Sequence, residues 1–213
     1  MTLAFDHVAI GAAGLAQGAV WIRDALGLEM PAGGRHPLMG THNRLTATGP
    51  DTYLEIIAVD PDAAAQRPRW FGLDDPAMRA RLAERPRPIA WIARTDDLDA
   101  ALAAARAAGL DLGRPVAMTR GDLAWRIALR DDGSLPEDGA LPLLIEWPAG
   151  PHPASRMADL GLRYTALRLR HPEPARLTTA LDALGATGPA HVVVGDASIE
   201  VDVNVNGKQA TLR

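Results

Sequence analysis

The chain has 213 residues, 47% hydrophobic and 23% charged, with a net charge of −4 and no cysteine. This composition is typical of a folded protein of one compact domain or two small ones. The lack of cysteine excludes disulfides, thiolate catalysis and zinc–sulfur sites. The acidic balance gives no overall attraction for nucleic acid or an anionic membrane. No apolar run reaches the ~18 residues of a membrane span, and no signal peptide is apparent, so we expect a cytoplasmic protein.

The N-terminal part of the chain reads as one strand, one helix and further strands. Residues 5–12 form an apolar strand pattern, and residues 15–27 carry apolar side chains at helical spacing up to a terminating glycine. The alternating segment 42–49 and the apolar segment 51–59 follow as strands. A proline-rich stretch then holds a short helix at roughly 75–84.

The same order of elements recurs 82 residues further along the chain. The helix stop at Gly27 matches that at Gly109, and Arg44 matches Arg126. A Gly-, Pro- and acid-rich loop at 132–140 interrupts this spacing before the last strand. The matching elements are a strand at 88–95, a helix at 97–109, and strands at 114–119, 123–132 and 141–148. The chain therefore predicts an internal repeat.

A third and shorter copy is expected at the C-terminal end, with a strand at 164–172, a helix at 172–185 and strands beyond it. The predicted class is α+β, built from paired βαβββ modules. The predicted segments are a first module at 1–62, a connecting segment at 63–87, a second module at 88–150 and a truncated third βαββ module at 160–213.

Several segments of the chain resemble the vicinal oxygen chelate superfamily, and most closely its glyoxalase-like domain proteins. The segments are FDHVAIG with His7, GTHNRL at 40–45, YLEIIAVDP at 53–61, RPRWFGL at 67–73 and LLIEWP with Glu146. The resemblance implies an open, U-shaped sheet with helices outside. It also implies that the first and last strands of each module bring metal ligands into the concave face.

Carried onto this chain, the resemblance places His7, Glu55 and Glu146 in that cleft as a set of three metal ligands. Strand alternation puts His7 on the face opposite Val8, and both carboxylates have apolar neighbours, where an unpaired charge is costly. One imidazole and two carboxylates leave positions open for substrate oxygens on Fe, Mn, Ni, Zn or Mg. Glu55 or Glu146 is also the candidate catalytic base.

The fourth ligand position of many relatives falls at Ile89, which cannot bind metal. The interpretation as a metal-free member of the superfamily therefore stays open. In that case Glu55 and Glu146 are polar ends on an exposed face of the sheet, and His7 is a cleft histidine that bonds to one of them. Candidate substrate-binding residues are His42, Arg44, Trp91, Trp125 and Arg126, with solvated or core positions as the alternative.

Two functions follow from these observations. The first is a divalent-metal-dependent enzyme, of isomerase, lyase or dioxygenase type, that acts on a small vicinal-oxygen substrate between the two modules. The alternative is a metal-free protein that binds or sequesters a small molecule with the same cleft. We expect neither nucleic acid nor membrane as a partner, and a homodimer through an exposed edge of the third module.

Overall fold

The computed structural model describes residues 3–186, 188 and 190–213, and it confirms the predicted α+β fold. Eight strands form one sheet in the order β2-β3-β4-β1-β5-β8-β7-β6. The first module supplies β1 (Ala4–Gly11), β2 (Ala32–His36), β3 (Thr41–Ala47) and β4 (Tyr53–Val59). The second supplies β5 (Arg87–Arg94), β6 (Arg114–Arg120), β7 (Leu123–Leu129) and β8 (Leu143–Glu146). The modules join where β1 pairs antiparallel with β5.

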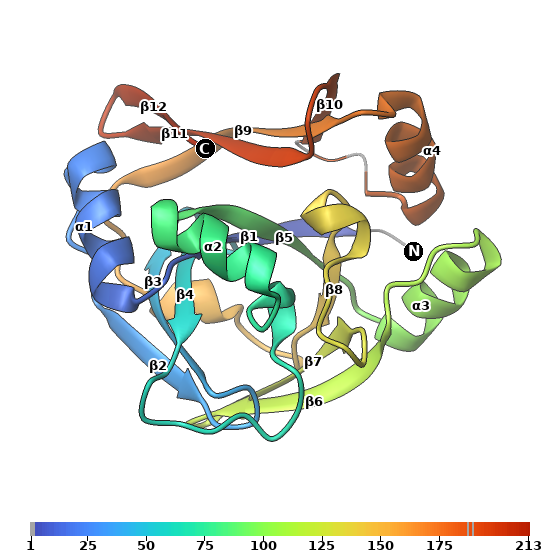
Figure 1. Cartoon of the computed structure of the whole chain (residues 1–213), viewed down its shortest axis with the longest axis horizontal. Coiled ribbons are helices and arrows are strands. Elements are labelled where there is room, and N and C mark those ends of the chain that lie inside the picture. Colours follow the sequence, from blue (N-terminus) through green and yellow to red (C-terminus); the bar gives the residue numbers. More distant parts are fainter. Residues whose placement is uncertain (1–2, 187, 189) are drawn as a thin grey trace.

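The sheet curls further than the open U that we expected. Its two edge strands, β2 and β6, lie against each other, so that the sheet nearly closes on itself (Figure 1). No backbone ladder joins these two edges within the described residues. The concave face therefore becomes an enclosed interior with a seam between β2 and β6.

The predicted helices form as α1 (Leu15–Leu26), α2 (Pro76–Glu84), α3 (Leu98–Ala107) and α4 (Pro174–Leu184). Local chemistry explains their ends. Gly27 takes the left-handed conformation with φ of 70° after α1, and the Asp97 side chain accepts the Ala100 N–H at the start of α3. The short 3-10 turns are η1 (Trp70–Gly72), η2 (Pro136–Gly139) and η3 (Pro153–Arg156).

The C-terminal unit differs from the truncated copy that the repeat predicted. It is a complete βαβββ unit with β9 (Leu162–His171), β10 (Ala190–Val194), β11 (Ser198–Val205) and β12 (Lys208–Leu212). Its strands run in the order β10-β9-β11-β12. The strand after α4 pairs directly and in parallel with β9, whereas two strands, β3 and β4, separate β2 from β1. The order of elements is shared with the modules, but the strand order is not.

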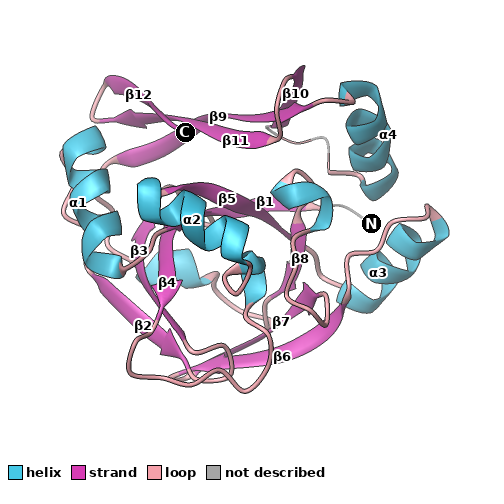
Figure 2. Ribbon diagram, in the orientation of Figure 1, coloured by secondary structure: helices cyan, strands magenta, loops and turns pink. Residues whose placement is uncertain are grey.

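This second sheet lies across the convex side of the first, over β1 and β5, with α1 towards one end and α3 and α4 towards the other (Figure 2). Apolar side chains fill the layer between the sheets, among them Val8, Ile10 and Leu54 on one side and Leu167 and Val201 on the other. A separate apolar cluster lines the concave interior. The central strands are thus buried on both faces, which explains their nearly continuous apolar sequences.

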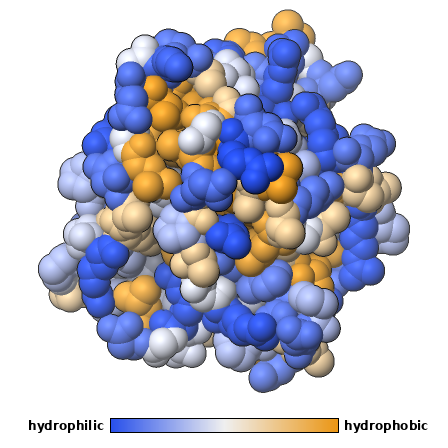
Figure 3. Space-filling model, turned by 90° about the vertical axis from the view of Figure 1, so that its left-hand side faces the viewer, coloured by the Kyte–Doolittle hydropathy of each residue, from blue (hydrophilic) through white to orange (hydrophobic). Residues whose placement is uncertain are grey.

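The exterior seen from the side of α1 is mostly hydrophilic, with apolar groups gathered in limited areas (Figure 3). Among the described residues, no helix has the length and apolar character needed to cross a membrane.

Candidate active site

A bulge in β1 brings Asp6 and His7 together. Phe5 pairs with Ala93 and His7 with Ile92, so Asp6 is an extra residue with no partner on β5. Such a bulge re-aims the side chains around it. As a result Phe5 packs edge-on against Tyr164 towards the second sheet, with ring centroids 4.9 Å apart. Asp6 and His7 are both buried.

The buried Asp6 carboxylate accepts three hydrogen bonds. Oδ1 accepts from His7 Nδ1 at 2.6 Å, and Oδ2 accepts from Trp147 Nε1 at 2.9 Å and His152 Nε2 at 3.0 Å. His152 Nδ1 accepts the Ala154 N–H, so the imidazole hydrogen must lie on Nε2. Although burial raises the pKa of Asp6, the bonds from His152 and His7 lower it to about 2. Asp6 is therefore an anion that keeps a proton on His7 Nδ1.

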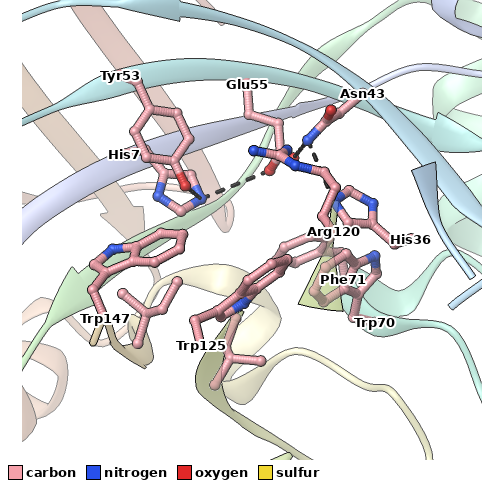
Figure 4. Close-up of a pocket in the computed structure, with 12 residues that line it drawn as sticks. His7, His36, Asn43, Tyr53, Glu55, Trp70, Phe71, Arg120, Trp125 and Trp147 are labelled. Carbon is pink, nitrogen blue, oxygen red and sulfur yellow. Dashed lines mark hydrogen bonds and ion pairs between the residues drawn. The ribbon is translucent and has the colours of Figure 1, made fainter. Parts of the chain in front are cut away.

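His7 presents its other nitrogen, Nε2, to the interior (Figure 4). Nε2 lies 3.3 Å from the Tyr53 hydroxyl and 3.7 Å from Glu55 Oε2, and the His7 and Tyr53 rings stack with centroids 4.1 Å apart. Burial raises the pKa of Tyr53 well above its ordinary value, so the phenol keeps its proton and donates it. His7 and Glu55 are thus two groups that can each hold a proton on the same side of the interior.

Asn43 holds Glu55 from the neighbouring strand. Its Nδ2 donates to Glu55 Oε1 at 2.7 Å and lies 3.4 Å from His36 Nε2, while its Oδ1 accepts the Gly34 N–H at 2.8 Å. The Oδ1 contact fixes which end of the amide faces Glu55. Burial, and then the nearby charge of Arg120, lower the pKa of His36 to about 3. His36 is consequently a neutral imidazole at neutral pH.

These polar groups line a pocket whose other walls are mainly aromatic. The lining side chains leave about 20 Å³ open to a water-sized sphere, room for about one water molecule, so a larger ligand has to move them apart; the empty volume that includes the open mouth is about 350 Å³. Phe71 adopts a φ of 59°, which is unusual for a bulky residue. The lining residues are His7, His36, Asn43, Tyr53, Glu55, Trp70, Phe71, Arg120, Trp125, Ile127, Ile145 and Trp147.

The buried neutral state of His36 predicts a pH dependence of stability. Between about pH 6.5 and 3, the unfolded chain protonates this imidazole while the folded chain does not, so stability falls as pH falls. From about pH 5.5 to 4.5, His36 should lower the free energy of unfolding by about 1.4 kcal/mol per pH unit. The free energy of unfolding, measured in urea at several pH values, should depend on pH less steeply by that amount in His36→Gln. The exposed His191→Gln should keep the wild-type slope against pH. Equal slopes in wild type and His36→Gln would refute this assignment.

Residues 5–185 match the model of a family described as a glyoxalase-like domain. The chain belongs to the glyoxalase-like domain family. This match confirms the predicted fold and the predicted membership of the vicinal oxygen chelate superfamily. Comparison with curated protein sequences gives no match.

Solved structures show where this glyoxalase-like fold recurs. A hypothetical protein from Staphylococcus aureus superposes with a TM-score of 0.63 at 14% identity, over 99% of this chain and 84% of that chain. A variant of Streptomyces coelicolor methylmalonyl-CoA epimerase in complex with 2-nitronate-propionyl-CoA gives 0.48 at 21%, over 72% and 100%. Methylmalonyl-CoA epimerase from Mycobacterium tuberculosis gives 0.41 at 24%, over 69% and 88%. At 14% identity the first of these similarities concerns the fold alone, and no conclusion is drawn from the other two.

The divalent metal that the superfamily implies does not fit the residues of this glyoxalase-like pocket. Within the described part of the chain, no three His, Asp or Glu side chains are grouped so that they could hold one ion. His7 and Glu55 face the pocket, but the second module contributes Ile127 and Ile145 in place of ligands. Arg120 adds a positive charge that opposes a cation. The structure therefore does not bring His7, Glu55 and Glu146 together as the predicted set of three metal ligands.

Glu146 fails to join the set because its strand is shifted by one residue from the register that we expected. Leu45 pairs with Glu55 in the first module, whereas Ile127 pairs with Ile145 in the second. A shift of one residue moves a side chain to the other face of a sheet. Glu146 consequently points outwards, where it accepts the Leu98 N–H at 2.7 Å and pairs with Arg126 at 2.8 Å. It stabilises the start of α3.

Four of the five predicted substrate-binding residues also lie outside the pocket, and only Trp125 lines it. Asn43 faces inwards on β3, so its neighbours His42 and Arg44 face outwards, and Arg44 donates to the Met30 carbonyl. Trp91 packs in the outer core and donates to the Ala140 carbonyl, and Arg126 pairs with Asp99 and Glu146.

Sequence reasoning missed Asn43, Tyr53 and Arg120 in the pocket, and also Asp6 and His152, which support His7 from behind it. The adjacent Asp6-His7 pair in a strand was a usable signal, since two consecutive polar residues interrupt an apolar strand pattern. Two adjacent glycines at 33 and 34 were a second signal, because glycine in a strand often marks a close approach. Nothing local pointed to His152, which reaches Asp6 from a distant loop.

Proposed function

We propose that this pocket is the active site of a proton-transfer enzyme, of isomerase or lyase type, that acts on a small molecule with vicinal oxygens. The observation that carries the proposal is the pair of His7 Nε2 and Glu55 Oε2, 3.7 Å apart and facing one pocket. The Asp6 anion orients His7, and Asn43 orients Glu55. Such fixed pairs are suited to general acid–base catalysis. A dioxygenase is not part of the proposal, because it needs a metal-ligand set that these residues do not form.

In the proposed reaction His7 Nε2 accepts a proton from a carbon beside a carbonyl group, and the C–H electron pair is delocalised onto the carbonyl oxygen as an enolate. The Glu55 carboxylate, with Oε2 3.7 Å from His7 Nε2, then takes this proton from His7 and returns it to the substrate. Tyr53 donates from its neutral hydroxyl and can stabilise the oxygen on which charge develops. Aromatic walls keep water away and strengthen these electrostatic interactions.

The proposal is tested by hydrogen–deuterium exchange at carbon. EDTA-treated protein in D2O is incubated with a panel of small 2-oxo and 2-hydroxycarbonyl compounds, and proton NMR follows the loss of the C–H signal beside the carbonyl. We expect exchange of at least one compound above the buffer rate. Exchange that depends on an added divalent metal would contradict the proposal.

A second function, metal-free binding of a small molecule, is favoured by the aromatic walls of the pocket, which include Trp70, Trp125 and Trp147. The same NMR panel separates the two, since a binding protein broadens or shifts ligand signals without exchange at carbon. The expected homodimer through an edge of the second sheet stays a prediction, which the mass in solution can test. The expected cytoplasmic location also stays a prediction.

A further inference from the structure

Arg120 crosses the seam between the two edges of the large sheet. It ends β6, and its side chain lies on the backbone of β2 at Gly34. A Cβ atom at Gly34 would come within 2.4 Å of Arg120 Cδ and 2.9 Å of Cγ. Because glycine has no side chain, position 34 leaves space for the Arg120 side chain to cross β2 and reach the pocket.

The charged end of Arg120 lies at the pocket, where Figure 4 shows it in the view between Glu55 and His36. Its charge helps to lower the pKa of His36 and opposes the rise in the pKa of Tyr53, as expected for a guanidinium near both side chains. Since His36 is neutral and Tyr53 keeps its proton, neither can neutralise the guanidinium.

Arg120 differs from other arginines of the sheets in its partners. Arg94 pairs with Asp51, Arg126 with Glu146, and Arg168 with Asp202. Among the described residues, no carboxylate lies within ion-pair distance of Arg120, and no hydrogen-bond acceptor is assigned to it. A half-buried guanidinium beside aromatic walls has lost part of its hydration, and an anion that enters the pocket would restore its hydrogen bonds.

We propose that Arg120 binds the anionic group of the ligand and makes the pocket selective for small planar monocarboxylates. The planar body suits the indole rings of Trp125 and Trp147, and the fork of the guanidinium matches a carboxylate. A single negative charge is favoured over two because the Glu55 carboxylate lies nearby. This inference adds a substrate class to the proposed function. It rests on that function for the reaction that follows binding.

Benzoate and its neutral isostere benzamide test the inference, with binding followed by tryptophan fluorescence and calorimetry. Wild type should bind benzoate about tenfold or more tightly than benzamide. Arg120→Gln should remove this preference, and Gly34→Ala should reduce it because the added methyl group displaces the arginine. Arg114→Gln, at the exposed start of the same strand, should keep it. Circular dichroism checks that each variant is folded.

Two results would overturn the inference: a wild type that fails to prefer benzoate up to about 10 mM ligand, or a preference that survives in Arg120→Gln. Phenylphosphonate, added about two pH units above its second pKa so that it is a dianion, should bind more weakly than benzoate at the same pH, and tighter binding would contradict the monocarboxylate assignment. Carbon exchange without an Arg120-dependent preference would overturn this inference alone. Arg120-dependent benzoate binding without exchange of any compound would overturn the proposed function alone.

Discussion

Replacing Asp6 with asparagine should lower the free energy of unfolding by about 3 kcal/mol or more. The carboxylate is fully buried and accepts hydrogen bonds from His7, His152 and Trp147. An amide of the same size has only one oxygen, so at least one buried donor would face an N–H group instead of an acceptor. Urea unfolding at neutral pH measures the loss.

The matched control is Asp62→Asn, in which an exposed carboxylate pairs with Arg35 at the surface. Its removal should change stability little, because solvent screens such pairs. The stabilisation from Asp6 should be complete above about pH 4 and should fall as pH drops towards 2, since the folded pKa lies below the unfolded one. A loss below about 1 kcal/mol for Asp6→Asn would show that the three hydrogen bonds do not hold this carboxylate as an anion.

The largest expected effect on activity comes from His7 and Glu55. His7→Gln and Glu55→Gln should each slow carbon exchange by about 10²–10⁴-fold, the usual contribution of a positioned acid or base. Both substitutions keep a polar side chain of similar size but remove the group that holds the proton. Proton NMR in D2O, with the best compound of the panel, gives the rates.

Glu146→Gln provides the control for this pair. Its carboxylate caps α3 and pairs with Arg126 outside the pocket, so its loss should lower stability while exchange continues at the wild-type rate. An equal loss of exchange in Glu146→Gln and Glu55→Gln would contradict the site described above. It would instead support the three-ligand set that the sequence predicts.

The fold was predictable because its signals are local. Helix stops such as Gly27 and Gly109 and the apolar strand patterns depend on neighbouring residues only, and their recurrence showed the duplication. The strand order of the third unit depends on which strands pair at long range. Its sequence resembles a module closely enough to predict the first strand and the helix, but the pairing of β10 with β9 has no local signature.

The pocket was predictable only in part, because side-chain direction depends on register. His7 and Glu55 were found because the family resemblance places them in the cleft, and strand alternation agrees for His7. Glu146 was placed wrongly because the length of the loop at 132–140 sets the register of β8. A shift of one residue puts Ile145 instead of Glu146 on the inner face. The role of Asp6 depends on a bulge against β5, and that of Arg120 on the contact of two sheet edges far apart in sequence.

The central claim is that Asp6 orients His7 for proton transfer and that the pocket does not chelate a metal. A long-range proton–nitrogen NMR spectrum of EDTA-treated protein, labelled with nitrogen-15 at histidine, tests it most directly. The account predicts that His7 Nδ1 carries a hydrogen, held by Asp6, and that one equivalent of Zn²⁺ leaves the His7 signals unchanged. An unprotonated Nδ1, or His7 signals that shift with one equivalent of Zn²⁺, would contradict it.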